Sequence, residues 1–385
     1  MSPGRGAAHC FGMNEDTSRR HTEDFSAVTR LFAWPLIATA VAGDVLAAQA
    51  RIAARLIAGA PDEPAAKPDW SMPNHVRLEL TTMDLRDFSG GTVGVPTLVC
   101  APFALHTAGI VDLAPGHSLV EALARHGRRR LFVTDWRSAT SDMRLLTIDN
   151  YLADLNVAVD EIGVPVDLVG LCQGGWMALI YAARFPDKVR RLVLAGAPVD
   201  TEAAPSSIAS AAHNLPLDLF DEIAHLGDGR LLGRNAMLLW ESALQSADVA
   251  AALQVPIDRR REGSDLMERF RRWSAAVVDL PGPFYRQAVL WLFKENRLAT
   301  GRFVALGRPI DLAETRHPLF LLAARDDEVV PPEQLFALQR LAGTRAEDIR
   351  TLTVGGGHLS LFLGADTLRE AWMPIAQWLA QDSST

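Results

Sequence analysis

The residues with the clearest chemical meaning form the run Gly170-Leu171-Cys172-Gln173-Gly174-Gly175. An apolar, strand-like stretch at 166–169 precedes this run, and a helix-like stretch at 176–184 follows it. The pattern is that of a nucleophile elbow, with Cys172 at the position that serine usually holds. A nucleophile in so sharp a turn needs small neighbours, and three residues meet that need: Gly170, Gly174 and Gly175. The alternative is a buried cysteine in an ordinary strand, turn and helix.

The elbow also predicts how the thiol is activated and how an oxyanion is held. Cys172 stands at the start of a helix, where the helix dipole favours a thiolate. The main-chain amide of Gln173 then points toward a developing oxyanion. The second donor is expected in the loop after the strand-like run 97–100, at the main-chain amides of Phe103 or Ala104. His106, a little further on, is an alternative donor or an ordinary surface or core histidine.

A thiol nucleophile needs a base, and the chain order of such sites is nucleophile, acid, histidine. His213 and His225 fall in a helical stretch, and His317 stands at the wrong end of a strand. His358 follows the strand-like run 349–354 in a glycine-rich loop, at the carboxyl edge where such sites assemble. We therefore expect His358 to be the base, the alternative being a surface histidine.

The acid is expected directly after the strand-like run 319–323. Asp326, Asp327 and Glu328 all stand there. We favour Asp327 over Asp326 as the partner of the base. The other carboxylate would then be a solvated loop residue.

Alternating strand and helix patterns must position these residues. The near-continuous apolar strands predict an α/β fold, a mostly parallel sheet with helices on both faces. The expected strands are 76–82, 97–100, 131–135, 166–170, 192–195, 319–323 and 349–354. The expected helices are 118–126, 148–161, 173–184, 332–341 and 368–380.

The alternation stops over residues 201–312, which we interpret as an inserted helical cap. The core then consists of residues 76–200 and 313–385. The cap carries three tryptophans that we expect to pack on the sheet: Trp240, Trp273 and Trp291. Residues 1–75 form an N-terminal extension, with a helix over 31–59 and a proline-rich linker over 61–73. A signal peptide is the alternative for the apolar stretch at 31–43.

Composition excludes several classes of protein. The 385 residues carry 38 basic and 46 acidic side chains, a net charge of −8, so no global basic field favours nucleic acid. Cys10, Cys100 and Cys172 are too scattered for a disulfide framework or a metal site, and a reducing, cytoplasmic compartment is expected. No apolar run reaches the roughly 18 residues of a membrane span.

A thiol nucleophile favours one class of acyl donor over another. A cysteine that takes an acyl group from a thioester exchanges one thioester for another, whereas taking it from an oxoester is uphill. A cysteine elbow therefore suits acyl transfer from a donor such as an acyl-CoA.

The elbow run, with the preceding Asp167-Leu168-Val169, resembles that of polyhydroxyalkanoate synthases, members of the α/β-hydrolase superfamily, and especially the short class III catalytic subunits. Further segments resemble the family in the same order along the chain: 110–115, 118–119, 135–137, 147–151, 197–200, 308–312 and 327–331. Other positions depart from the family pattern: His106, Thr107, Ala139, Glu328 and the residues after His358.

The resemblance implies an enzyme that joins 3-hydroxyacyl groups from CoA thioesters into a polyester, without a further cofactor. It implies that Cys172 carries the acyl group and that His358 is the base. Asp327 then orients His358 or helps to activate the substrate hydroxyl. Acyl-CoA, a polyester granule, a second synthase subunit and further copies of the chain are the implied partners.

Two other functions share these residues. A polyester depolymerase or thioesterase passes through the same acyl-enzyme, with water as the acceptor. A non-enzymatic, granule-associated homologue would keep only the fold, which the intact Cys172, Asp327 and His358 argue against.

Overall fold

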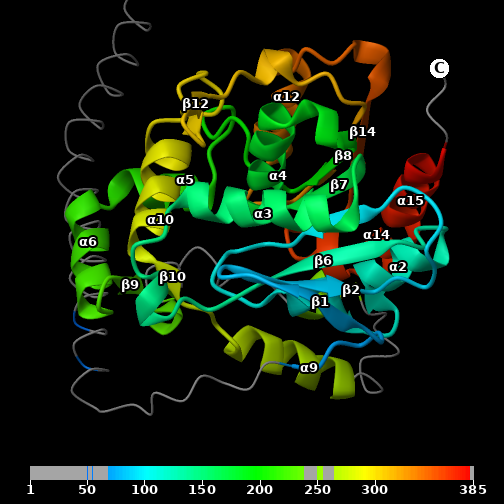
Figure 1. Cartoon of the computed structure of the whole chain (residues 1–385). Coiled ribbons are helices and arrows are strands. Elements are labelled where there is room, and N and C mark those ends of the chain that lie inside the picture. Colours follow the sequence, from blue (N-terminus) through cyan, green and yellow to red (C-terminus); the bar gives the residue numbers. More distant parts are fainter. Residues whose placement is uncertain (1–49, 51–53, 55–67, 238–248, 255–263, 382–385) are drawn as a thin grey trace, which may run out of the picture. The chain divides into compact units, whose positions relative to one another are not determined.

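An eight-stranded β-sheet forms the centre of residues 60–385 (Figure 1). The structure, a computed structural model, describes residues 50, 54, 68–237, 249–254 and 264–381. Residues 1–59 make a separate unit, so every element below belongs to residues 60–385. Trp240, most of the linker and all but residues 50 and 54 of the helix expected over 31–59 lie outside the described residues.

The strands lie in the order β1-β2-β6-β3-β7-β8-β13-β14. β1 pairs antiparallel with β2 and β2 with β6, while every later pair from β6 to β14 is parallel. The mostly parallel sheet that the sequence predicted is thus confirmed. The strands are β1 (His75–Glu79), β2 (Met83–Asp87), β3 (Thr97–Cys100), β6 (Leu131–Trp136), β7 (Val166–Leu171), β8 (Val189–Ala195), β13 (Leu319–Ala324) and β14 (Ile349–Val354).

The first part of the sheet differs from the sequence prediction. Instead of one strand over 76–82, the chain forms a hairpin of β1 and β2. β2 buries only Met83 and Leu85 and alternates them with charged residues. Two apolar residues give too short a period-two signal to be told from a loop. β2 nevertheless completes the sheet, because Met83 lies opposite Trp136 of β6.

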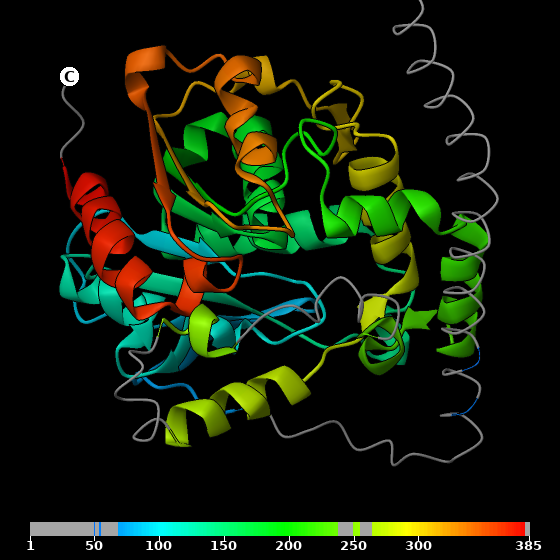
Figure 2. The same cartoon turned by 180° about the vertical axis from the view of Figure 1, so that it is seen from behind.

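Helices cover both faces of the sheet, as the alternation predicted (Figure 1, Figure 2). On one face, α4 (Gln173–Arg184) packs against β7, and α3 (Ile148–Ile162) lies beside α4. The buried residues of α3 recur every three or four positions, which is why this segment is helical. On the other face, α2 (Leu119–Arg125) and α15 (Met373–Ala380) share a core cluster with Val169 and Leu171 of β7.

Two expected helices are interrupted. The helix over 332–341 consists of α11 (Pro332–Phe336) and α12 (Leu338–Leu341). A π-helical turn, Leu368–Trp372, precedes α15. In the described part of the chain, no helix has both the length and the apolar character to cross a bilayer.

A helical insertion joins β8 to β13 and runs within residues 201–312. Its described helices include α5 (Ser207–Asn214), α6 (Leu217–Leu226), α8 (Val249–Ala252), α9 (Ser264–Ala275) and α10 (Gly282–Gln287), and a π-helical stretch, Ala288–Lys294, continues α10. Helix α9 packs against the short strand β4 (Asp112–Ala114), and both views show it away from α5 and α6 (Figure 1, Figure 2). Trp273 on α9 is buried and Trp291 is half-buried.

Candidate active site

Cys172 occupies the turn between β7 and α4, with φ of 48° and ψ of −118°. A residue other than glycine seldom adopts a positive φ, so the surrounding structure must hold the turn in place. Two main-chain hydrogen bonds do so: Cys172 N–H donates to the carbonyl of Ala195 at 2.9 Å, and Gly175 N–H donates to the carbonyl of Cys172 at 2.9 Å. The nucleophile candidate is therefore fixed to both β8 and its own helix.

Close backbone packing explains the glycines of the elbow. A Cβ on Gly174 would lie 2.3 Å from the carbonyl oxygen of Cys100, at the end of β3. A Cβ on Gly170 would lie 2.6 Å from Cα of Gly175. A Cβ on Gly175 would lie 2.4 Å from Cβ of Ala197. Because main-chain atoms are involved in the first two contacts, no side-chain rotation could relieve them.

His358 and Asp327 lie together, as the chain order led us to expect. His358 Nδ1 is 2.7 Å from Oδ2 of Asp327, and the Asp327 side chain is fully buried. The other carboxylate oxygen of Asp327 accepts hydrogen bonds from the main-chain N–H groups of Val329 at 2.9 Å and Val330 at 2.8 Å. The neighbouring Asp326 is exposed. Of the two carboxylates, Asp327 is the one that orients the imidazole.

The second nitrogen of His358 is left for the thiol. Nε2 is buried, and none of the described residues forms a hydrogen bond of normal geometry with it. Burial alone would lower the pKa of His358, but the charges of Asp327 and Cys172 hold that pKa well above its ordinary value. Cys172 is therefore near enough to act on the ring, although the contact is looser than a formed hydrogen bond. Such bonds often tighten only when substrate binds.

The expected oxyanion donors lie on two neighbouring segments. Gln173 begins α4, and the first N–H groups of a helix have no partner within the helix. The loop after β3 approaches the same helix end, since the carbonyls of Cys100 and Ala101 crowd Gly174. The main-chain N–H groups of Phe103 and Ala104 make no hydrogen bond to another described residue.

The ring of Phe103 anchors that loop. It stacks on Tyr151 with centroids 4.9 Å apart and meets Phe284 of the insertion edge-on at 5.2 Å. Phe103 is 1 % exposed, so its main chain cannot shift without disturbing this aromatic cluster. The arrangement can hold an acyl carbonyl between the loop and the elbow.

Comparison with known proteins identifies the family of the chain. The profile of the alpha/beta hydrolase fold matches residues 108–365. A Poly(3-hydroxyalkanoate) polymerase subunit PhaC from Synechocystis is 30% identical over 71% of this chain and 74% of its own. Its counterpart from Allochromatium vinosum is 28% identical over 70% of this chain and 76% of its own. The chain belongs to the poly(3-hydroxyalkanoate) polymerase family.

Solved structures agree with the fold of this polymerase family member. The esterase RhEst1 from Rhodococcus sp. aligns over 80% of this chain and 99% of its own, with a TM-score of 0.50 at 17% identity. A likeness at that identity concerns the α/β-hydrolase fold only.

Two residues outside the sequence motifs, Gly196 and Phe362, also shape the site of this polymerase-family member. Gly196 follows β8 with φ of 54°, and a Cβ there would lie 3.1 Å from Cε1 of His358. Phe362 meets the His358 ring edge-on at 5.2 Å. Both lie far from Cys172 along the chain and have no motif of their own. Only the resemblance of 197–200 to the family pointed to the neighbourhood of Gly196.

Three other histidines and one other cysteine among the described residues lie away from the His358–Asp327 pair. His317 is buried ahead of β13, with Nε2 3.4 Å from the carbonyl of Ala182, and burial lowers its pKa. His213 and His225 lie on α5 and α6. Cys100 is fully buried, and burial raises its pKa to about 12. None of these groups contacts the His358–Asp327 pair.

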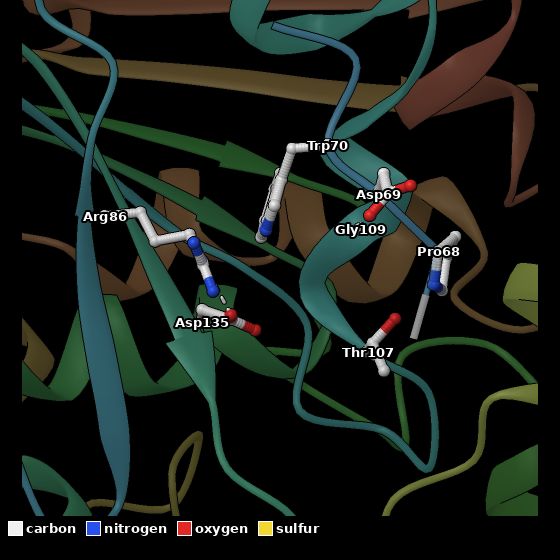
Figure 3. A pocket seen from close by; sticks show the side chains of 7 residues that line it. All are labelled: Pro68, Asp69, Trp70, Arg86, Thr107, Gly109 and Asp135. Carbon is white, nitrogen blue, oxygen red and sulfur yellow. Dashed lines mark hydrogen bonds and ion pairs between the residues drawn. The ribbon is translucent and has the colours of Figure 1, made fainter. Parts of the chain in front are cut away.

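A cavity of about 270 Å³ lies beside the loop after β3, and Figure 3 shows its lining. Arg86 spans it, pairing with Asp135 at 2.7 Å and covering the ring of Trp70 at 5.2 Å. Neither Cys172, Asp327 nor His358 lines this cavity. Its lining residues are Pro68, Asp69, Trp70, Arg86, Thr107, Gly109 and Asp135.

Proposed function

We propose that the chain is a polyhydroxyalkanoate synthase-like acyltransferase, which moves 3-hydroxyacyl groups from CoA thioesters through Cys172 to a growing polyester. The observation that carries this proposal is the placement of a cysteine, rather than a serine, in an elbow beside a buried His358–Asp327 pair. Membership of the poly(3-hydroxyalkanoate) polymerase family supports the same reaction class.

The first half-reaction follows from the groups in place. His358 takes the proton of Cys172, and the thiolate attacks the carbonyl carbon of the acyl-CoA. Main-chain N–H groups of Gln173 and of Phe103 or Ala104 stabilise the oxyanion. When the tetrahedral intermediate collapses, the bond to the CoA sulfur breaks and the imidazolium returns the proton to that sulfur. The thioester of CoA becomes a thioester of Cys172.

The second half-reaction reuses the same base. The hydroxyl of a 3-hydroxyacyl acceptor gives its proton to His358 as its oxygen attacks the acyl-cysteine. The carbon–sulfur bond then breaks, an ester forms, and the Cys172 thiolate takes the proton back. Asp327, fully buried, keeps Nδ1 of His358 in the productive orientation throughout.

A hydrolase is the second candidate, since water in place of the hydroxyl would release a free acid. The thioester-for-thioester exchange at Cys172 favours the synthase. We further propose that the enzyme works in the cytoplasm at a polyester granule, as a homo-oligomer with a second subunit. The relatives' description as a polymerase subunit supports that partner.

The test is CoA release from 3-hydroxybutyryl-CoA and from a medium-chain 3-hydroxyacyl-CoA, with the products analysed by mass. A synthase gives ester oligomers and reveals the chain length it prefers. Free hydroxy acid alone would make the protein a thioesterase. Cys172→Ala should abolish CoA release in either case, and release that survives this change would contradict the assignment of the nucleophile.

A further inference from the structure

The helical insertion holds the loop that carries the expected oxyanion donors. His106 of this loop pairs antiparallel with Val277, just after α9. Val278 N–H donates to the carbonyl of Leu105 at 2.8 Å. Leu105 has φ of 70°, so the loop is bent at the residue directly after Ala104. These contacts join the insertion to the main chain next to the donors.

Trp273 makes the closest side-chain contact in this junction. Its indole N–H donates to the carbonyl of Thr107 at 3.0 Å, and its ring stacks on His106 with centroids 4.7 Å apart. Trp273 is 5 % exposed. On its other side, Thr107 lines the 270 Å³ cavity of Figure 3, and its buried hydroxyl has no hydrogen-bond partner among the described residues. Trp273 thus fixes this end of the loop on one side, while the cavity on the other side leaves Thr107 with fewer packing contacts.

Gln254 joins the insertion to the loop that carries His358. Its side-chain oxygen accepts from Thr367 N–H at 2.9 Å. Its amide nitrogen donates to the hydroxyl of Thr367 at 3.2 Å and to the carbonyl of Gly355 at 3.4 Å. A Cβ on Gly364 would lie 2.5 Å from the Gln254 oxygen, so a glycine leaves room for the contact. One side chain therefore bridges both ends of the segment around His358.

We propose that Trp273 and Gln254 are positioning residues, through which the insertion fixes the oxyanion loop and the His358 loop on either side of Cys172. Neither residue touches the reacting atoms. The catalytic roles of the two loops rest on the proposed function. The contacts that Trp273 and Gln254 make with these loops are observed independently of it. The experiments below use iodoacetamide and p-nitrophenyl acetate, so they remain informative if the protein does not make a polyester.

Alkylation of Cys172 by iodoacetamide reports on His358 alone, because it needs no oxyanion donor. The charged groups acting on His358 are Asp327 and Cys172. The other residues against its ring are uncharged: Gly196 and Phe362. A displaced His358 should hold the proton of the thiol less well, so the alkylation profile should move to higher pH.

Gln254→Ala is the first variant. At pH 6 we expect alkylation of Cys172 to slow about fivefold, the size expected for the loss of the one hydrogen bond that Gln254 makes to the start of the His358 loop, at the carbonyl of Gly355. Gln287→Ala is the matched control, since Gln287 also lies on the insertion and accepts from a core main-chain N–H, that of Ile148, at 3.0 Å. Gln254→Met keeps the side-chain length and replaces Gln254→Ala if the latter unfolds.

Trp273→Phe is the second variant, which keeps the stacked ring and removes the indole N–H. We expect the acylation burst with p-nitrophenyl acetate to slow about tenfold, less than removing an oxyanion donor outright. The alkylation profile should stay unchanged. Trp291→Phe, a change on the insertion away from both loops, is the control and should leave both rates as they are.

We expect each variant to affect one loop only, so the two measurements distinguish the role of Gln254 from that of Trp273. An unchanged alkylation profile in Gln254→Ala and Gln254→Met would overturn the role of Gln254. An acylation rate of Trp273→Phe equal to that of Trp291→Phe would overturn the role of Trp273. Normal results here with no CoA release from any 3-hydroxyacyl-CoA would instead reject the proposed substrate.

Discussion

Asp327 and Asp326 are neighbours in sequence, but only Asp327 meets His358. Burial lowers the pKa of His358, and the charges of Asp327 and Cys172 raise it further than burial lowers it. His358 therefore keeps its proton up to this raised pKa and loses it as the pH rises through that value. The Asp327 carboxylate therefore favours the protonated imidazole of His358 beside Cys172.

Asp327→Asn should remove this effect. The pKa of His358 then falls, so the imidazole accepts the thiol proton less readily and alkylation of Cys172 should need a higher pH. Turnover should drop by about 10²- to 10⁴-fold, as in other triads that lose the acid. Asp326→Asn, a change at an exposed carboxylate, is the control. A pH profile that shifts equally in both variants would reject the pairing.

Gly196 gives a second residue-scale prediction. Alanine there would take a strained backbone and also press on His358, whereas Gly301, at φ of 67°, has open space around it. Gly196→Ala and Gly301→Ala should each cost about 1–2 kcal/mol of unfolding free energy in urea. Only Gly196→Ala should also lower turnover, by about tenfold. Equal turnover in the two variants would show that His358 tolerates the added carbon.

Some residues of the site could be predicted from the sequence and others could not. The elbow is local, so spacing alone predicted a turn at Cys172 between a strand and a helix. His358 and Asp327 follow strands, and the chain order predicted their positions. Gly196, Trp273 and Gln254 matter through contacts with residues distant in sequence, and such contacts leave no periodic signal.

At the scale of elements, a buried ion network ties β7 to the end of α15. Asp167 on β7 is fully buried and pairs with Arg128 at 2.8 Å and Arg190 at 2.7 Å. Both arginines also donate to the carbonyl of Leu379, at the last turn of α15. The network lies at the amino end of β7, opposite the elbow, and so concerns stability.

Asp167→Asn should therefore leave the buried guanidinium of Arg128 and the half-buried guanidinium of Arg190 without their carboxylate. We expect a loss of about 3–5 kcal/mol in unfolding free energy, measured in urea. Asp160→Asn is the control, because Asp160 pairs with Lys188 at the surface and should cost at most about 1 kcal/mol. If Asp167→Asn costs no more unfolding free energy than Asp160→Asn, the two arginines must find other hydrogen-bond acceptors.

Elements were predictable where their pattern was long. The ends of β3, α4 and β14 agree with the sequence prediction because prolines or a glycine stand close to them: Pro96 and Pro102 at β3, Pro186 after α4 and Gly355 after β14. β2 was missed because only two of its residues are buried. The splits at Ala337 and at Leu368–Trp372 interrupt continuous helical patterns, so periodicity could not show them.

At the scale of the whole molecule, we expect part of the insertion to move away from the core when a long acyl-CoA reaches Cys172, because Cys172 is only 9 % exposed. The bridge between His106 and Val277 offers a way to prevent this separation. Opposite residues of an antiparallel pair have Cα atoms about 4.5–5.5 Å apart, within the range of a disulfide. The double variant His106→Cys, Val277→Cys can therefore be locked by oxidation.

When oxidised, this double variant should release CoA from 3-hydroxyacyl-CoA at least about tenfold more slowly than when reduced, because the disulfide would block the opening that we expect for a long acyl-CoA. Dithiothreitol should restore the rate, which makes each sample its own control. Acylation by the small p-nitrophenyl acetate should change little, since it needs no such opening. The single variants exclude oxidation of Cys172 as the cause. Equal CoA release in the two redox states would mean that insertion and loop stay joined throughout turnover, and that acyl-CoA enters by another route.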